Sequence, residues 1–442
     1  MIEVKQAAAT SATPSPRPPR GVVLRGAFLF ADFFLIITAY YQVKPASRSL
    51  FIEHLGADML PYVWIGTAAI LGVGMTLYHR LVATRSRYGV VLGTCWLFLL
   101  SLLLFAVLLK NPGPALAVAF YILVDILGVV LVEQFWSLAN SLYTTVEGKR
   151  WYGLVGAGGL TGGVAGGALG AALLHFTPLR TADLLWVAAA LLGLLIGLTA
   201  VMARLGLYRE TRPESQAGAA NGWRVLGRNR YLLLVAGILL VAQLAEPVVE
   251  FQFMKSVEQR FAEQDTRTAF LSAFFSMLGL VSIGVNLVIT PAVHRFQGVI
   301  AGLMVQPLAL ALSAIGFMAH PTLALAGVMK AADRGLSYSI NRASRELLYV
   351  PIAPRLIYQA KAWIDMFGYR LFKVVGSILI LLMTQWLPWR VTPAELGWLT
   401  LSVCLAWVLM VTVLRPDYHR IHRTQDPPGE QTAAGIPAAR GR

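Results

Sequence analysis

The chain has 442 residues, of which 57% are hydrophobic and only 13% are charged, and its formal net charge is +15. Soluble domains carry about a quarter of their residues as charged side chains, so this composition excludes an ordinary soluble protein. The charges lie in short stretches between apolar runs of about 20 residues, each long enough to cross the hydrocarbon core as a helix. Transmembrane β-strands would be shorter and would alternate in polarity. The sequence therefore predicts an all-α integral membrane protein with about twelve transmembrane helices.

The order of the apolar runs predicts two bundles. Residues 1–22 are rich in Ala, Ser, Thr and Pro and lack an apolar core, which predicts a disordered cytoplasmic tail rather than a signal peptide. Residues 23–204 hold six apolar runs, a hydrophilic cytoplasmic linker spans 205–230, residues 231–414 hold six more, and a cytoplasmic tail follows at 415–442. This 6+6 division is the arrangement of a major-facilitator fold.

The placement of the basic residues predicts the orientation. If the N-terminus is cytoplasmic, most of the 37 Lys and Arg residues fall in cytoplasmic segments. The positive-inside rule then places both termini in the cytoplasm. The basic excess reflects topology and attraction to anionic lipid. We therefore expect membrane lipid, and no nucleic-acid polymer, as a partner.

The fifth run, at about residues 153–175, is dominated by glycine. Its glycines recur at spacings of three and four: Gly153, Gly156, Gly158, Gly159, Gly162, Gly163, Gly166, Gly167 and Gly170. Small-residue ladders of this kind let helix backbones approach closely, which favours a packing face against a moving neighbour. A phosphate-binding loop is the alternative, but the Gly-Lys-Ser/Thr ending that such a loop needs is missing.

Five apolar runs carry several charges at helical spacing. An ionised side chain at the bilayer centre costs about 2.5–3.5 kcal/mol on insertion scales, so we expect these stripes to face a hydrated interior. The stripes are Asp32, Tyr40, Lys44 and Arg48 in the first run; Asp125, Glu133, Trp136 and Asn140 in the fourth; Gln243, Glu246 and Glu250 in the seventh; Lys330, Arg334, Ser337, Asn341 and Arg345 in the tenth, with Arg342 beside them; and Asp365, Tyr369 and Lys373 in the eleventh, with Arg370 adjacent.

Two interpretations of these charges stay open. Most of them could pair with one another as gates between the halves, or a subset of the bases could face an anionic substrate, since Arg and Lys suit carboxylate or phosphate. The tenth and eleventh runs carry more bases than acids, so we place the anion nearest to them. Lys373 either pairs with an acid such as Glu250 or holds the substrate.

Several segments resemble the nucleotide (ATP/ADP) transporter family of plastids and obligate intracellular bacteria. Residues 338–351, Tyr-Ser-Ile-Asn-Arg-Ala-Ser-Arg-Glu-Leu-Leu-Tyr-Val-Pro, are similar to the family's Tyr-Ser-Leu-Phe-Asp-Pro-Thr-Lys-Glu-x-x-Tyr-Ile-Pro. Further matches are Lys361-Ala362 with Asp365, Arg370-x-x-Lys373-x-x-Gly376-Ser377, Phe135-Trp136 with Ala139-Asn140, Glu147-x-Lys149-Arg150-x-Tyr152, and Gly56-Ala57-Asp58-x-Leu60-Pro61-Tyr62. The resemblance covers most of residues 25–390 and implies a major-facilitator-like architecture.

The resemblance also implies functional residues. The family relies on two basic and two acidic intramembrane charges, of which Asp125, Glu250 and Lys373 carry over by motif position. The family's Lys-Asp pair of the first run falls on Ser47-Arg48, so Arg48, or Lys44 one turn earlier, takes the place of its lysine. The family's Asp in the tenth run is Arg342 here. These replacements keep the anion-binding character.

We therefore expect a secondary active transporter that works by alternating access on an anionic solute, for example a phosphorylated one such as a nucleotide, in ATP/ADP-type exchange or uptake. The alternatives are a proton-coupled porter for another organic anion or an amphiphilic lipid-like substrate, and a non-transporting membrane sensor or scaffold. The expected location is the bacterial inner membrane, and a monomer is the favoured state. The expected substrate-binding residues are Lys44, Arg48, Asp125, Glu250, Lys330, Arg334, Asn341, Arg342, Arg370 and Lys373.

An enzyme is not expected. The seven histidines form no constellation with Ser or Cys that would support catalysis. Cys95 and Cys404 both lie in apolar runs and are interpreted as small buried hydrophobes. The sequence predicts no catalytic residues, no metal site and no cofactor.

Overall fold

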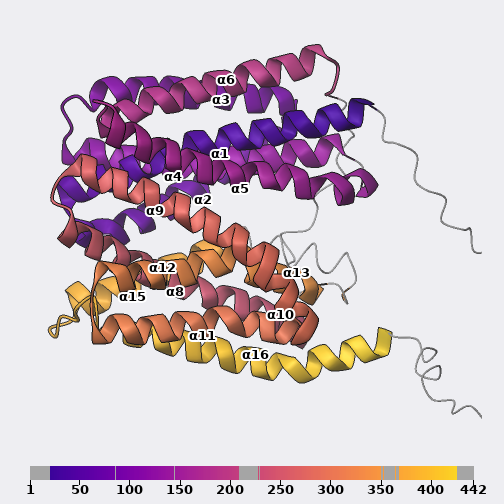
Figure 1. Cartoon of the computed structure of the whole chain (residues 1–442), viewed down its shortest axis with the longest axis vertical. Coiled ribbons are helices and arrows are strands. Elements are labelled where there is room, and N and C mark those ends of the chain that lie inside the picture. The colour runs from indigo at the N-terminus through magenta and orange to yellow at the C-terminus, as the bar shows by residue number, and fades with distance from the viewer. Residues whose placement is uncertain are drawn as a thin grey trace, which may run out of the picture.

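The computed structural model describes residues 20–84, 86–143, 145–208, 229–349 and 368–425, together with positions 227, 352 and 364. This part of the chain is helical, without strands. It forms two bundles, an N-terminal half (α1–α6) and a C-terminal half (α8–α16), which lie side by side in Figure 1. The predicted all-α membrane fold in two halves is confirmed. The predicted tails and linker (1–22, 205–230, 415–442) and Asp365 fall largely outside the described residues.

The N-terminal half consists of six long helices. They are α1 (Arg20–Leu55), α2 (Leu60–Thr84), α3 (Arg87–Leu108), α4 (Pro114–Leu142), α5 (Thr145–Phe176) and α6 (Leu184–Arg204). Short 3₁₀ turns, Ala57–Met59 and Thr181–Asp183, precede α2 and α6.

The C-terminal half is interrupted by π-helical turns. Its helices are α8 (Arg230–Arg260), α9 (Gln264–Gly284), α10 (Thr290–Phe296), α11 (Gly298–Ala319), α12 (Leu323–Leu336), α13 (Arg342–Tyr349), α15 (Tyr369–Leu381) and α16 (Gly397–Gln425). The π turn Val285–Ile289 joins α9 to α10, Ser337–Asn341 joins α12 to α13, and Leu382–Trp386 follows α15. Each joined pair runs on as one column.

Ten helical stretches in the described part are long and apolar enough to cross a membrane. The column α12–α13 and helix α15 bring the C-terminal half to six, as in the N-terminal half. The column α12–α13 carries several charges and contains a π turn. Some helices extend beyond the apolar runs. The charged end of α1, including Arg48, is buried rather than hydrated, and the helix continues to Leu55. α5 begins at Thr145 rather than near residue 153, and α16 continues past residue 414 to Gln425.

Most of the predicted glycine face of α5 is a packing face, although Gly153 and Gly156 have open space around them. A Cβ on Gly158 or Gly162 would lie 2.4 or 2.6 Å from a backbone oxygen of α1, and one on Gly167 would lie 2.6 Å from the Ser272 carbonyl oxygen of α9. The α1 side chain of Gln42 donates to the Gly166 carbonyl at 2.7 Å. Helix α5 thus lies against α1 of its own half and α9 of the other, as Figure 1 shows.

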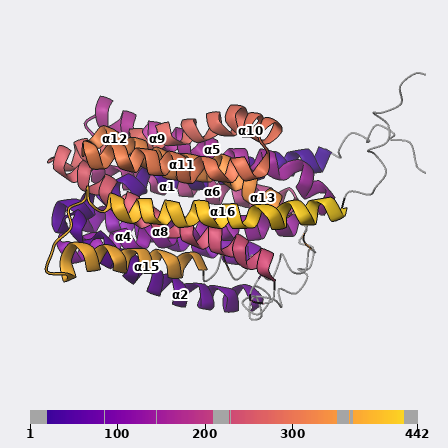
Figure 2. The same cartoon turned by 90° about the horizontal axis from the view of Figure 1, so that it is seen from below.

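A second seam joins α2 to α15, which run side by side along one edge of the molecule in Figure 2. The contacts α5–α9 and α2–α15 therefore bring the two halves together along two lines. The charged faces of α1, α4, α8, α12 and α15 lie between these lines.

Candidate functional site

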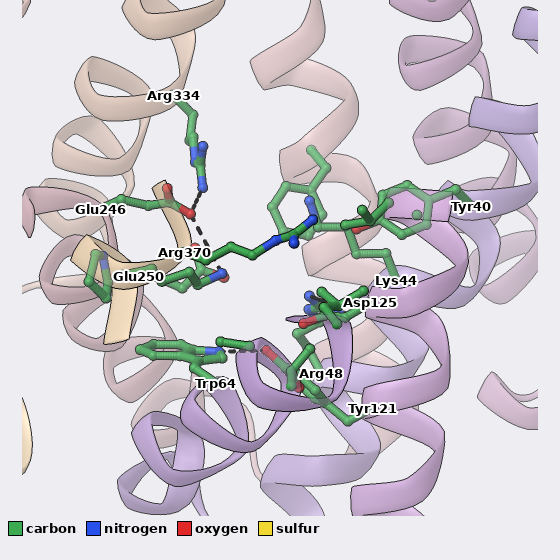
Figure 3. Close-up of a pocket in the computed structure, with 18 of the residues that line it drawn as sticks. Tyr40, Lys44, Arg48, Trp64, Tyr121, Asp125, Glu246, Glu250, Arg334 and Arg370 are labelled. Atoms are coloured by element: carbon green, nitrogen blue, oxygen red, sulfur yellow. Dashed lines mark hydrogen bonds and ion pairs between the residues drawn. The ribbon is translucent and has the colours of Figure 1, made fainter. Parts of the chain in front are cut away.

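A cavity of about 280 Å³ lies between the two halves. Its walls come from α1, α2 and α4 on one side and from α8, α9, α12, α15 and the π turn Ser337–Asn341 on the other (Figure 3). The basic residues that line it are Lys44, Arg48, Lys330, Arg334, Arg370 and Lys373, and the acidic ones are Asp125, Glu246 and Glu250. The structure thus brings together in one cavity charges as far apart in the chain as Lys44 and Lys373.

Arg48 is held by the N-terminal half. Its guanidinium pairs with Asp125 of α4 and donates to the Ser47 hydroxyl at 2.9 Å. The same group lies 4.3 Å from the ring centroid of Tyr121, whose hydroxyl accepts from the Trp64 indole at 2.8 Å. Arg48 is 6% exposed, so its ion pair is buried. Such a pair is costly to break, because it leaves an uncompensated charge.

Lys330 and Arg334 are held by carboxylates of the C-terminal half. Lys330 is 1% exposed, and its ammonium lies 2.6 Å from Glu250 and 3.4 Å from Asp333. Arg334, one turn later on α12, pairs with Glu246. Each of these bases therefore already has a carboxylate, as the dashed lines in Figure 3 show for Arg334.

Lys373 lies within ion-pair distance of Glu246, and not of Glu250, the acid suggested for it by the sequence. Its ammonium lies 3.8 Å from Glu246, a carboxylate that already pairs with Arg334, while Glu250 pairs with Lys330. Its side chain is also 36% exposed, far more than that of Lys330. Lys373 is therefore the most weakly paired of the three bases in this network.

Lys44 has no carboxylate at ion-pair distance among the described residues. Its ammonium instead lies 5.5 Å from the ring centroid of Tyr40, 5.4 Å from that of Tyr41 and 4.6 Å from that of Phe275. Cation–π contacts of this kind hold a cation in place without neutralising its charge. The charge of Lys44 therefore remains available to an anion in the cavity.

Two of the expected binding residues do not line the cavity. Asn341 is buried and donates to the Gln306 side chain of α11, and Arg342 is exposed. Asn341 is the last residue of the π turn Ser337–Asn341, and Arg342 directly follows it. A π turn inserts an additional residue into a helix, so residues after it leave the face that a regular 3.6-residue spacing assigns to them.

Some cavity residues were not among the expected site residues. Glu246 shares the helical spacing of Gln243 and Glu250, and this signal could have identified it. The rings of Tyr41, Trp64, Tyr121, Phe275 and Tyr338 also line the cavity. In the sequence they cannot be distinguished from the many aromatic residues of a membrane protein's core.

Polar contacts join the halves at one end of the molecule, here called the sealed end. It comprises the C-terminal ends of α1 and α8, the start of α9, and residues 56–62 and 385–396. Arg267 of α9 pairs with Glu53 of α1 at 3.1 Å and donates to the Ser49 carbonyl at 3.1 Å. Lys255 of α8 pairs with Asp58 at 2.8 Å. These contacts tie the two halves together beyond the cavity.

Further contacts reinforce the sealed end. The carboxylate of Glu258 accepts from the Ala57 amide at 2.9 Å, and the Gln385 side chain donates to the Asp58 carbonyl at 2.8 Å. One hydrophobic cluster there contains Phe51 of α1 together with Phe253 of α8. The cavity is thus separated from this end by both an apolar layer and a polar one.

The two six-helix halves with a charged cavity between them have a major-facilitator-like fold. The model of the TLC ATP/ADP transporter family matches residues 115–418. This chain belongs to that family, which confirms the resemblance seen in the sequence.

Among the relatives, ADP,ATP carrier protein 1 of Chlamydia muridarum is 25% identical over 307 residues, which cover 59% of this chain and 57% of that protein. ADP,ATP carrier protein 4 of Rickettsia felis is 22% identical over 364 residues, covering 72% of this chain and 68% of that protein. The match thus spans little more than half the length of the first relative.

Solved transporters share the fold. The POT family transporter PepTSo superposes with a TM-score of 0.60 at 12% identity, covering 93% of this chain and 100% of that chain. The nucleoside transporter NupG superposes with a TM-score of 0.52 at 14% identity, covering 92% and 100%. At such identities the likeness concerns the fold alone.

Proposed function

We propose that this chain is a secondary active transporter that moves an anionic, phosphorylated solute such as a nucleotide by alternating access. The observation that carries the proposal is the charge of the cavity, where six basic side chains face three acidic ones. Arg48, Lys330 and Arg334 are matched by Asp125, Glu250 and Glu246. The remaining positive charge favours an anion that enters the cavity.

Lys44, Arg370 and Lys373 are the bases that we assign to the substrate. Lys44 belongs to the N-terminal half, and the other two belong to α15 of the C-terminal half. Figure 3 shows Arg370 extending from its helix toward the side of the cavity where Lys44 lies. An anion held by both sides would tie the halves together, and its binding energy would shift the equilibrium between the two open states. The relatives named ADP,ATP carrier support a nucleotide as this anion.

The sealed end supports alternating access. If the halves rock as rigid bodies, the cavity can open to the other side of the membrane when the ion pairs between the halves at this end break. No change within either bundle is required. By the distribution of basic residues we place the sealed end outside and both termini in the cytoplasm of a bacterial cell, with the protein in its cytoplasmic membrane.

The test is exchange in proteoliposomes. Vesicles that contain the purified full chain and unlabelled ADP should accumulate labelled ATP faster than vesicles without internal ADP, and Lys373→Gln should abolish the difference while the protein remains inserted. Uptake that is indifferent to internal ADP but driven by a proton gradient would favour the proton-coupled alternative. The absence of uptake of any anion would contradict a transporter.

A further inference from the structure

Aromatic rings from both halves gather in one part of the cavity. Tyr40 and Tyr41 come from α1, Phe275 comes from α9, and Tyr338 comes from the π turn Ser337–Asn341. The ring centroids of Tyr41 and Phe275 are 6.1 Å apart across the boundary between the halves. Tyr41 and Tyr338 line the same cavity from opposite halves. These four rings therefore belong to one region, here called the ring region.

Tyr338 differs from the other three rings because its surface is largely free. The residue is 50% exposed although it lines the cavity, whereas Phe275 is 4% exposed. Lys44 lies over Tyr40, Tyr41 and Phe275 but not over Tyr338. Within the described residues Tyr338 stacks on no other aromatic ring. A large ring with an uncovered face in a binding cavity is free to contact a ligand.

The π turn explains why the ring is presented in this way. Ser339, Ile340 and Asn341 of the same turn are buried in the C-terminal half, while Tyr338 remains at the cavity. The π turn thus separates the ring from the residues that anchor the column. Single π turns of this kind occur frequently at functional sites.

The position of Arg334 beside Tyr338 indicates which chemical group would fit in the ring region. Its guanidinium lies 5.8 Å from the ring centroid of Tyr338, and its terminal nitrogen lies 3.5 Å from the Tyr338 hydroxyl. An alkyl chain in the ring region would lie against this guanidinium and the phenol hydroxyls, and it could not form hydrogen bonds with them. A planar aromatic group could stack on the ring and on the guanidinium plane, as nucleobases do on Tyr and Arg.

We infer that Tyr338 determines specificity for the planar aromatic group of the transported anion. Its ring stacks on that group, and Lys44, Arg370 and Lys373 hold the anionic group. The inference rests on the proposed anion transport and deepens it, because it assigns the planar group and the anionic group of the solute to different side chains of the cavity. The ring region is formed by both halves, because Tyr41 belongs to α1 and Phe275 belongs to α9.

The test compares two probes, ADP and inorganic pyrophosphate, which carry similar anionic groups. Only ADP also carries a nucleobase. Binding to the purified full chain is measured by calorimetry. Tyr338→Leu should weaken ADP binding about tenfold, in the range found when a stacked ring is removed, and should leave pyrophosphate binding within about twofold. The matched control is Tyr338→Phe, which keeps the ring and should bind ADP within about twofold of the wild type.

The remaining outcomes separate this inference from the proposed function. Equal weakening of both probes by Tyr338→Leu, or unchanged ADP binding, overturns the inference and leaves anion transport standing. If the wild-type protein binds pyrophosphate as tightly as ADP, the inference is likewise overturned and anion transport still stands. Wild-type protein that binds neither probe contradicts the proposed function and the inference with it. If Tyr338→Leu does not melt cooperatively, Tyr338→Met, which also lacks a ring, takes its place.

Discussion

Lys44 and Arg48 lie one helical turn apart on α1, yet their surroundings give them different roles. The charge of Arg48 is neutralised by Asp125 in a buried pair, whereas the Lys44 ammonium lies over the rings of Tyr40 and Phe275. Losing Arg48's partner should therefore affect folding, and losing Lys44 should affect binding. Residue type and spacing alone would treat the two bases as equivalent.

We expect Asp125→Asn to lower the free energy of unfolding by about 3 kcal/mol, because Arg48 is left buried without its carboxylate. Lys44→Met should leave the melting temperature nearly unchanged but weaken ADP binding roughly thirtyfold, which is the loss of about 2 kcal/mol from a hydrogen bond to a charged group. Thermal unfolding and calorimetry on the two variants test this. If Lys44→Met melted as early as Asp125→Asn, the distinction would be wrong.

Spacing along the helices predicted which charges face a common interior, and the structure places most of them in one cavity. Asn341, at the end of the π turn, and Arg342, directly after it, leave that face because the turn changes the helical register, and no local sequence pattern predicts a π turn. The partner choices of Glu246 and Glu250 depend on how α8 sits against α12 and α15. That tertiary arrangement is not encoded in the spacing within one helix.

At the scale of helices, α5 shows how a sequence pattern becomes a structural requirement. Gly158, Gly162, Gly166 and Gly167 lie so close to α1 or α9 that they leave no room for a methyl group, while Gly156 on the same helix has open space around it. The ladder was predictable because small residues at steps of three and four have few other uses in a membrane helix. Which neighbours it would contact was not predictable.

Replacing Gly162 and Gly166 by Ala should cost about 1–3 kcal/mol of stability, because each methyl group would collide with the backbone of α1 and force overpacking. Gly156→Ala, in open space, is the matched control and should be neutral or slightly stabilising, since Ala favours a helix. Thermal unfolding of the purified variants checks the difference. Equal melting temperatures for the two changes would show that the ladder is not a packing face.

At the scale of the whole molecule, the contacts at the sealed end would stabilise one of the two states of the proposed alternating-access cycle. The buried Arg267 is central to it, because it pairs with Glu53 and also donates to the Ser49 carbonyl of the other half. The sequence indicated the two halves but not the side of closure. Closure depends on residues that lie outside the apolar runs.

Arg267→Ala should therefore shift the equilibrium toward opening of the sealed end. Loss of about 2 kcal/mol from charged hydrogen bonds raises the open population roughly thirtyfold. The rate at which an impermeant maleimide added outside labels a cysteine at Ala68, which lines the cavity, reports this population. The native Cys95 and Cys404 are buried.

Arg260→Ala is the control for this experiment, because Arg260 is exposed at the same end and forms no ion pair with a described carboxylate. Its labelling rate should equal that of the unchanged protein. A rise in both variants would indicate general loosening instead of release of a specific contact.

The contact between Trp386 and Tyr62 has an optical consequence. The Trp386 indole donates to the Tyr62 hydroxyl at 3.2 Å, and that hydroxyl donates to Gln385 at 3.1 Å, so an indole of one half has its polar partner on the other. When the halves separate at this end, the indole exchanges a phenol for water. Because indole emission depends on the polarity around the ring nitrogen, the fluorescence that disappears in Trp386→Phe should follow the transport cycle in real time, without any attached dye.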